Sequence, residues 1–527
     1  MTRALGVEIT AMLRARGVDT VFGIPGVHNQ ELYRGMEAAE IRHVLARHEQ
    51  GAGFMADGYA RASGRPGVAF VITGPGLTNI MTPMGQAYSD SVPMLVISSA
   101  LDDIETRHGQ LHQMRDQVAA AGTVCDWSVE ARTAEDAYAL IDRALEEFHH
   151  SRARPKHIQV PMGLLSGAAP PFPEAPTPFA NPELDCHAIA QAAAHIEAAS
   201  RPLVILGGGS SGAAPEVRAL LTRIQAASFA SYAGRGVAEP GDPLHFGSML
   251  ARPGSADIAR EADLLIVLGS TLSEVDLWRD RLGHVCPAIR VDIDADVLRQ
   301  DLGHGTLGIK GDVGQVCVAL LAAIDTPRDS QWSAARVAEQ IALWRQEVSD
   351  ERPGVAEVCE ILLSAVPQGA LFFSDMTQLA YGAKEIYPLG APGLWHHPYG
   401  FGTLGFALPA AIGGKLARPE EPVIAIAGDY GFQYTVQELA TAVELGLSLP
   451  ILLWDNGKLG EIEDSIRRAQ IRPNAVIARN PDFVSLARAY GAAAVDPADP
   501  VALSAAIGQA LEHPGPTLIR VTPETVA

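Results

Sequence analysis

Long apolar runs, paired cysteines and an excess of positive charge are all missing from this sequence. No uninterrupted apolar run approaches twenty residues, so the sequence predicts no membrane-spanning helix. The five cysteines are scattered, odd in number and without a C-x-x-C pair, which argues against disulfides and against a structural zinc site. The formal net charge of −21 argues against nucleic acid or an anionic membrane as a partner.

The first twenty residues also lack the apolar centre of a signal peptide, because Arg14, Arg16 and Asp19 stand there. Together with the cysteine pattern, this predicts a cytoplasmic protein. An apolar content of 47% and a charged content of 19% are ordinary for a globular enzyme. A length of 527 residues is enough for about three domains.

Short apolar runs alternate with helical patterns along the whole chain, as in doubly wound parallel sheets. In residues 1–166 the expected strands are Thr20–Ile24, His43–Ala46, Val68–Thr73, Met94–Ser98 and His157–Val160. A proline-rich linker is expected at 167–183. A second unit, 184–345, has expected strands at Leu203–Leu206, Ala227–Tyr232, Leu264–Leu268 and Ile289–Ile293.

A third unit, residues 346–527, repeats the rhythm of the first after a helical connector near Trp332 to Val348. Its expected strands are Leu371–Ser374, Val423–Ala427, Ile451–Trp454, Ala492–Val495 and Thr517–Val521. The sequence therefore predicts an α/β fold of three doubly wound parallel-sheet domains, of which the middle one is Rossmann-like.

The middle unit contains a Gly-x-Gly-x-x-Gly pattern from Gly207 to Gly212, which in isolation suggests a dinucleotide site. The next expected strand, however, offers no Asp or Glu for a ribose hydroxyl. A structural role for these glycines is therefore favoured over a working NAD site, and FAD binding by this unit stays open.

The stretch from Val423 to Ile462 carries the strongest chemical signal. A buried-type strand ends at Gly428, Asp429, Tyr430 and Gly431; an expected helix follows and closes at Gly446, and a second strand ends before Asn456. Adjacent parallel strands would bring Asp429 and Asn456 together at one sheet edge, where open α/β sheets bind ligands. Their oxygens suit Mg²⁺, and the free amides after Gly428 suit a phosphate group.

This stretch resembles the Gly-Asp-Gly…Asn-Asn signature of thiamine-diphosphate-dependent enzymes. The resemblance implies thiamine diphosphate and Mg²⁺ as cofactors, with Asp429, Asn456 and the backbone carbonyl of Lys458 as metal ligands. Two positions depart from the signature: Tyr430 replaces its second Gly and Asp455 its first Asn. The whole chain then resembles this family's arrangement, in which two thiamine-diphosphate-binding folds flank the middle domain.

Further residues acquire roles from this resemblance. Glu49, within RHEQGAGFMADGYAR, stands where the family's glutamate activates the aminopyrimidine ring. Leu404 would be the wedge that bends the cofactor, and the backbone of Gly402 and Leu404 would meet the pyrimidine edge; an ordinary core leucine in a Gly-rich turn is the alternative. The cofactor contacts that it implies also include Thr377, Gln378, Gly428, Tyr430 and Gly431. The turn from Gly74 to Asn79 is a family-like turn and helix start whose role could be only structural.

Proton transfer beside the reactive carbon is less well marked. After Pro25-Gly26-Val27 this sequence has His28, where pyruvate-decarboxylase-like members carry Asp and benzoylformate-decarboxylase-like members carry Ser. The nearest substitutes for the family's paired histidines are His112 and Gln113. His28 or His112 could move protons at neutral pH, although either could be a purely structural histidine.

The N-terminal third resembles acetolactate-synthase-like proteins, and within them 2-ketoarginine decarboxylases. The implied reaction is loss of carbon dioxide from a 2-oxo acid, 5-guanidino-2-oxopentanoate, to give 4-guanidinobutanal, a step of arginine catabolism. Glu461 is the expected partner of the guanidinium or a proton relay, while Glu463 and Asp464 are expected on a solvated first turn. Acetolactate-type carboligation, a dehydrogenase and an inactive paralogue are the alternatives. The family implies a homodimer or homotetramer with active sites between subunits.

Overall fold

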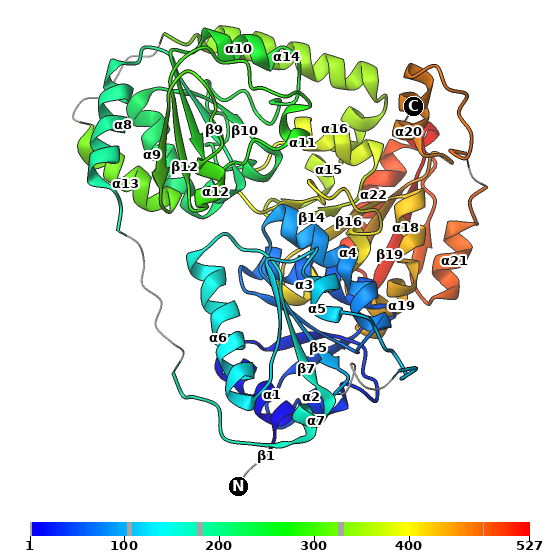
Figure 1. Cartoon of the computed structure of the whole chain (residues 1–527). Coiled ribbons are helices and arrows are strands. Elements are labelled where there is room, and N and C mark those ends of the chain that lie inside the picture. Colours follow the sequence, from blue (N-terminus) through cyan, green and yellow to red (C-terminus); the bar gives the residue numbers. More distant parts are fainter. Residues whose placement is uncertain (1–2, 103–107, 176–182, 325–330, 478, 527) are drawn as a thin grey trace. The chain divides into compact units, whose positions relative to one another are not determined.

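A computed structural model of the protein describes residues 3–102, 108–175, 183–324, 331–477 and 479–526 (Figure 1). Three parallel β-sheets with flanking helices make up most of these residues, which confirms the predicted α/β fold class. The chain forms two compact units, one of residues 1–180, 370–377 and 401–525 and one of mainly 181–369 and 378–400. None of the helices in the described ranges is long and apolar enough to cross a membrane.

The N-terminal sheet has the strand order β3-β2-β4-β5-β7-β6, and all its pairs are parallel. Because all pairs are parallel, the carboxyl ends of the strands lie at one edge, and the order of the strands changes side between β2 and β4. Its strands are β2 (Thr20–Gly23), β3 (Arg42–Leu45), β4 (Gly67–Val71), β5 (Met94–Ala100), β6 (Trp127–Glu130) and β7 (Lys156–Pro161). Its helices are α1 (Leu5–Ala15), α2 (Gln30–Arg34), α3 (Glu49–Ser63), α4 (Pro75–Asp90), α5 (Gln117–Ala121), α6 (Ala134–His150) and α7 (Met162–Ser166).

A short antiparallel pair, β1 (Arg3–Ala4) with β8 (Ala168–Ala169), closes this part of the chain. Part of the expected proline-rich linker, residues 176–182, lies outside the described residues. The predicted bounds of the linker and of the three domains stay predictions.

The middle sheet has the order β10-β9-β11-β12-β13 with all pairs parallel. The order of the strands changes side at β9, as in a Rossmann-like sheet. Its strands are β9 (Pro202–Leu206), β10 (Ala227–Ala230), β11 (Leu264–Leu268), β12 (Ala288–Asp292) and β13 (Thr306–Lys310). The helices around it include α8 (Cys186–Ala198), η1 (Gly208–Ala213), α9 (Ala214–Ile224), η2 (Tyr232–Gly234), α10 (Ser255–Glu261), α11 (Glu274–Leu277), α12 (Ala295–Leu298), α13 (Val313–Ala323), α14 (Ala334–Glu351) and α15 (Val355–Ala365). Helix α14 covers the expected connector.

The C-terminal sheet runs β14-β16-β17-β19-β18, again with parallel pairs. Its strands are β14 (Leu371–Ser374), β16 (Val423–Gly428), β17 (Leu449–Trp454), β18 (Ala493–Val495) and β19 (Pro516–Val521), and β15 covers Trp395–His396. The helices of this part are α17 (Ala407–Ala417), α18 (Asp429–Tyr434), η3 (Val436–Glu438), α19 (Leu439–Glu444), α20 (Gly460–Arg468), α21 (Phe483–Ala489), α22 (Pro500–Glu512) and η4 (Pro523–Val526). Helix α16 (Gln378–Ile386) and β15 belong to the other compact unit.

The connection between β16 and β17 differs from the single helix that the sequence predicts. It consists of α18, the 3₁₀ turn η3 and α19, and the regular α-helix breaks at Thr435. The Thr435 hydroxyl donates to the carbonyl of Gly405 at 2.8 Å, a tertiary bond that competes with helical continuation. The predicted end at Gly446 is correct, and its φ of +59° explains the glycine.

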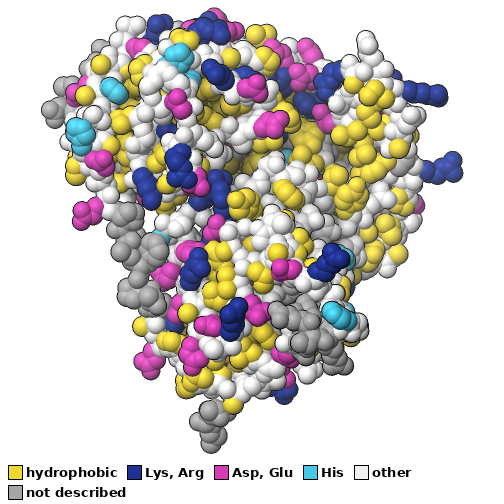
Figure 2. All heavy atoms as spheres, in the orientation of Figure 1, with side chains coloured by type: hydrophobic (Ala, Val, Ile, Leu, Met, Phe, Trp, Pro, Cys, Tyr) yellow, Lys and Arg dark blue, Asp and Glu magenta, His cyan; other side chains and the backbone are white. Residues whose placement is uncertain are grey.

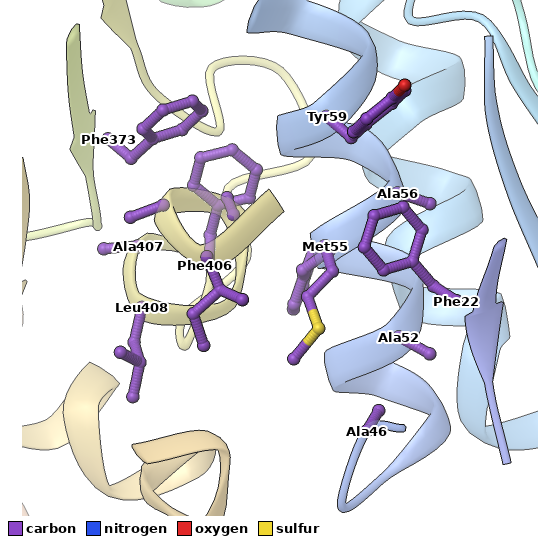
Figure 3. Close-up of a cluster of buried hydrophobic side chains, with 14 of the residues drawn as sticks. Phe22, Ala46, Ala52, Met55, Ala56, Tyr59, Phe373, Phe406, Ala407 and Leu408 are labelled. Carbon is purple, nitrogen blue, oxygen red and sulfur yellow. The ribbon is translucent and has the colours of Figure 1, made fainter. Parts of the chain in front are cut away.

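Helices α3 and α17 pack closely and join the N-terminal and C-terminal sheets into one core (Figure 3). A Cβ on Gly58 would lie 2.0 Å from the carbonyl oxygen of Ala410, and one on Gly413 would lie 1.9 Å from that of Met55. Glycine at both positions therefore allows the two helix backbones to approach. This contact holds α3, the helix that begins at Glu49, against α17.

Candidate active site

Glu49 is the first residue of α3 and is only 8% exposed. The helix is capped by His48, whose Nδ1 accepts from the N–H of Gln50 at 3.1 Å. Asn79 on α4 donates its amide N–H to Glu49 Oε2 at 2.9 Å, so the turn from Gly74 to Asn79 does more than shape the backbone. A partly buried carboxylate at a helix start, held by one amide, is suited to share a proton with a ring nitrogen.

Beneath the start of α3 lies a second carboxylate, Glu438, that the sequence gives no reason to single out. It is fully buried and accepts from the N–H groups of Arg47 and His48, each at 3.0 Å. The Thr441 hydroxyl donates to its other oxygen at 2.9 Å. Burial raises the pKa of Glu438 to about 7, and these hydrogen bonds oppose that rise.

His28 and His112 form a pair in the structure, with ring centroids 4.8 Å apart and planes at 63°. His28 follows β2 and His112 follows β5, so the carboxyl edge of the sheet brings them together. Among the described residues, neither Nδ1 atom has a hydrogen-bond partner although both are buried. Burial, and secondly the neighbouring His112, lower the pKa of His28 from its usual value of 6.5.

Backbone packing holds the two histidine loops in place. Asn29 accepts from the N–H of Gly26 at 2.8 Å, which fixes the turn before His28. Gly74, with φ +70°, approaches the carbonyl of His112 so closely that a Cβ would lie 2.3 Å from its oxygen. His112 itself has φ +65°, a conformation that side chains other than Gly rarely adopt.

The expected metal ligands stand at the ends of two paired strands, since Gly428 of β16 lies opposite Trp454 of β17. Asp429 is 3% exposed, and the backbone N–H groups of Tyr430 and Gly457 both donate to its carboxylate. Burial raises the pKa of Asp429 above its ordinary value, and these donors oppose the rise. The carboxylate therefore reaches the turn that carries Asn456.

The turn at the end of β17 presents the other expected ligands. Asn456 Oδ1 accepts from the N–H of Lys458 at 3.2 Å, which closes the turn. No group of three or more His, Cys, Asp or Glu side chains suited to a metal occurs among the described residues. One carboxylate, one amide oxygen and one backbone carbonyl are hard oxygen donors that leave coordination positions to phosphate and water, so this set fits Mg²⁺.

At this edge Gly431 is required by a close contact, and Gly428 stands in a tight one. A Cβ on Gly431 would lie 2.2 Å from Asp375 Oδ2, and one on Gly428 would lie 3.2 Å from the side chain of Thr377. Asp375 is 1% exposed, and burial raises its pKa to about 6. Its Oδ2 accepts from the N–H of Gly405 at 2.8 Å and thereby ties the two predicted cofactor loops together.

The loop predicted to bend the cofactor is built around glycines with positive φ. Gly402 has φ +66° and Gly405 has φ +84°, and Leu404 between them is partly exposed. Thr403 beside them donates to Gln86 of α4 at 2.8 Å, so the loop is fixed to the N-terminal sheet's helices. Gln378 begins α16 and is partly exposed.

The turn from Asp455 to Lys458 carries two of the expected metal ligands and is called the metal turn below. The acidic residues after it separate into two kinds. Glu463 is 5% exposed and lies between Lys458 Nζ at 2.9 Å and Arg467 Nη2 at 2.6 Å. The expectation that it decorates a solvated turn is therefore wrong, because the ion pairs cover it. Asp464 is exposed as expected, and Glu461 is partly exposed on the first turn of α20.

The predicted residues thus form two groups. Glu49, His28 and His112 belong to the carboxyl edge of the N-terminal sheet, where Asn79 is the neighbour of Glu49. The second group, Asp429, Asn456, Lys458 and Glu461, belongs to the carboxyl edge of the C-terminal sheet. Asn480, which donates to Asp429 Oδ2 at 2.7 Å, was missed because it stands 51 positions away in the sequence.

In the middle sheet, the contacts of the glycine pattern favour its structural interpretation. A Cβ on Gly207 would lie 2.1 Å from the carbonyl oxygen of Gly269, and a Cβ on Gly209 would lie 3.0 Å from the Cα of Gly269. These glycines let the ends of β9 and β11 approach.

Comparisons with known proteins agree with this organisation. Residues 4–120 match the thiamine pyrophosphate enzyme N-terminal TPP binding domain, residues 189–320 the central domain, and residues 375–521 the C-terminal TPP binding domain of the same enzymes. A Pseudomonas aeruginosa protein named "Probable 2-ketoarginine decarboxylase AruI" is 43% identical over 99% of this chain and 94% of its own length.

More distant relatives carry another name. The acetolactate synthase isozyme 1 large subunit of Escherichia coli is 29% identical, over 98% of this chain and 94% of its own. The acetolactate synthase large subunit of Parasynechococcus marenigrum is 31% identical, over 97% and 86%. The matches cover all three sheets and both edges that carry the predicted site, and the chain is a member of the thiamine pyrophosphate enzyme family.

Proposed function

We propose that this enzyme decarboxylates a 2-oxo acid without oxidation, with 5-guanidino-2-oxopentanoate as substrate and 4-guanidinobutanal and carbon dioxide as products. The observation that carries this proposal is the 43% identity, over nearly both full lengths, to the protein named as a probable 2-ketoarginine decarboxylase. The acidic first turn of α20 beside the metal turn supports it, since a guanidinium pairs well with a carboxylate.

Thiamine diphosphate, when bound, supplies the carbon nucleophile and takes up the electron pair released with carbon dioxide. Asp429, Asn456 and the carbonyl of Lys458 would hold Mg²⁺, which in turn neutralises the diphosphate. Thr377, Gln378 and the backbone around Gly428 to Gly431 would line the diphosphate, and Gly402 and Leu404 the rings.

Glu49 would hold and return a proton at N1′ of the aminopyrimidine. Its low exposure and the hydrogen bond from Asn79 keep its carboxylate in one orientation, which this transfer requires.

The pair His28 and His112 would move the proton that completes the aldehyde. A lowered pKa leaves His28 neutral at pH 7, so one ring nitrogen can accept a proton and return it. The two ring centroids lie 4.8 Å apart, so one histidine could pass a proton to the other or to water beside it.

The working site would form between two subunits, with the N-terminal group from one and the C-terminal group from the other, so a homodimer or homotetramer is expected. Large apolar side chains next to both groups support this: Val27 is 69% exposed, Leu111 64%, Phe401 52% and Ile462 50%. Figure 2 shows hydrophobic side chains gathered over α18 and α20. A partner subunit would cover them.

Acetolactate-type carboligation is the second candidate, because the more distant relatives are named acetolactate synthases. It would use the same cofactor and the same residues, but a second 2-oxo acid in place of the proton.

A cytoplasmic location stays a prediction, supported by five free cysteines.

A screen of 2-oxo acids for carbon dioxide release, with aldehyde and acetoin-type products separated, tests the proposal. We expect the guanidino acid to be turned over fastest, with aldehyde as product. Chelation and gel filtration should leave an inactive protein that thiamine diphosphate and Mg²⁺ restore only together. Full activity without thiamine diphosphate, or faster turnover of pyruvate to acetolactate, would contradict the proposed function.

A further inference from the structure

One amide group joins two carboxylates at the edge of the C-terminal sheet. Asn480 Nδ2 donates to Asp429 Oδ2 at 2.7 Å and to Asp455 Oδ1 at 2.8 Å. Asp429 follows β16 and Asp455 follows β17, so the amide bridges the ends of two neighbouring strands. The second oxygen of Asp455 accepts from Arg520 Nε at 2.7 Å, which keeps that carboxylate in place.

The orientation of this amide is set by its other contact. Asn480 Oδ1 accepts from Gln433 Nε2 at 3.3 Å, and the same Gln433 group donates to the carbonyl of Asp429 at 3.0 Å. Because an amide oxygen only accepts and an amide nitrogen only donates, both N–H groups of Asn480 must point at the carboxylates.

Neighbouring residues of the same loop hold the metal turn itself. The N–H of Leu459 donates to the carbonyl of Val476 at 2.8 Å, and Lys458 forms an antiparallel bridge with Ile477. The loop that carries Asn480 thus contacts two of the three expected ligand residues, one through a side chain and one through the backbone.

Without a donor between them, the carboxylates of Asp429 and Asp455 would repel each other, and Asp429 could turn away from Asn456. With Asn480 present, Asp429 Oδ1 accepts from the N–H of Tyr430 at 3.0 Å and Oδ2 from Asn480, so both oxygens are fixed. We propose that Asn480 is a positioning residue that keeps Asp429 in the orientation needed to bind the divalent cation. This inference rests on the metal site of the proposed function.

The test measures cation affinity rather than turnover. Mn²⁺ replaces Mg²⁺ as a spectroscopic probe, and the free ion is titrated by electron paramagnetic resonance with the full chain and saturating thiamine diphosphate. Loss of a hydrogen-bond partner of a metal ligand typically weakens binding by about 10–100-fold. We expect that loss in Asn480→Ala and equally in Asn480→Leu, which has nearly the same shape but no donor.

Asn474→Ala is the matched control, because Asn474 is an exposed asparagine of the same loop, and it should bind like wild type. Unchanged circular dichroism and melting temperature without metal exclude a general loss of structure, and if Asn480→Ala does not fold, Asn480→Leu decides. Wild-type affinity in folded Asn480→Leu would overturn the proposal. Wild-type affinity in Asp429→Ala would instead refute the metal site itself, and the proposed function with it.

Discussion

The carboxylate of Glu438 accepts a hydrogen bond of 3.0 Å from the backbone N–H of His48, the residue directly before Glu49. The same carboxylate lies against Gly51, where a Cβ would be only 2.2 Å from Glu438 Oε1. Glu438 therefore occupies the N-terminal end of α3, where free N–H groups favour a negative charge. The C-terminal part of the chain thus sets the position of a predicted catalytic residue of the N-terminal part.

Stability should depend on pH through Glu438. Its pKa of about 7 lies above the ordinary 4.5, so between these values the folded state binds more protons than the unfolded state. The free energy of unfolding should therefore fall as pH rises from about 4.5 to about 7. Glu438→Gln removes this contribution, so its melting temperature should fall less over that interval than that of wild type.

Differential scanning fluorimetry of both proteins at pH 5 and pH 8 measures this difference. Glu444→Gln is the matched control, because the Glu444 side chain is 57% exposed although it also pairs with this part of the chain through Arg47. Parallel pH profiles for wild type and Glu438→Gln would show that the buried carboxyl does not titrate in this range.

Glu49→Gln should keep the fold and bind the cofactor, yet exchange the C2 proton of thiamine diphosphate about 10²–10⁴-fold more slowly, the usual contribution of a general acid–base group. Exchange is followed by NMR after rapid mixing with deuterium oxide. Glu37→Gln, an exposed glutamate of the same domain, should exchange like wild type. An unchanged rate in Glu49→Gln would remove this residue from the mechanism.

The acid side of the pH–rate profile should report the histidine pair. Burial and the neighbouring His112 both lower the pKa of His28, so the acid limb of kcat/KM should lie below pH 6.5 in wild type. His112→Asn removes one of the two causes and should move that limb to higher pH, while His28→Asn should abolish it. His149→Asn, an exposed histidine on α6, serves as control. If the acid limbs of wild type, His112→Asn and His28→Asn coincide, the histidine pair does not take part in the proton transfer.

Most of the sheets could be predicted because their strands are buried apolar runs. Among the strands that the sequence does not predict, β6 (Trp127–Glu130) and β13 (Thr306–Lys310) are edge strands with partly exposed residues. Such strands alternate or mix polar residues, so their signal resembles that of a loop.

The expected metal ligands and Glu49 could be predicted from the sequence, because each follows a strand or begins a helix within a short motif. The residues that hold them in place could not be predicted in this way. Glu438 stands 391 positions from Arg47, which it contacts, and looks like an ordinary polar position of an amphipathic helix. The pairing of His28 with His112 likewise depends on the strand order of the sheet, in which β4 lies between β2 and β5, and the order of elements along the chain does not state it.

Two inactive variants should restore activity when their subunits mix. Glu49→Gln inactivates one half of a shared site and Asp429→Ala the other, so hybrid dimers regain one intact site in principle. Mixing after mild dissociation, followed by a decarboxylation assay, should return up to about a quarter of the wild-type activity per subunit if pairing is random. Subunit exchange shown by mass spectrometry with no recovered activity would contradict the site between subunits.

The acidic turn after the metal ligands offers one residue for the substrate's guanidinium. Glu463 is occupied by Lys458 and Arg467, so its charge is already compensated. Asp464 is exposed, whereas Glu461 is partly buried on the first turn of α20. Glu461 is the carboxylate of this turn that we predict to recognise the substrate or to relay a proton.

Glu461→Gln separates these two roles. Loss of a charge-assisted hydrogen bond costs about 1.5–3 kcal/mol, so the preference in kcat/KM for 5-guanidino-2-oxopentanoate over an uncharged 2-oxo acid should fall roughly 10–150-fold. A proton relay would slow both substrates by the same factor and leave the preference intact. Asp464→Asn, on the same helix but exposed, should change neither value. A preference that survives in Glu461→Gln would move guanidinium recognition to another part of the site.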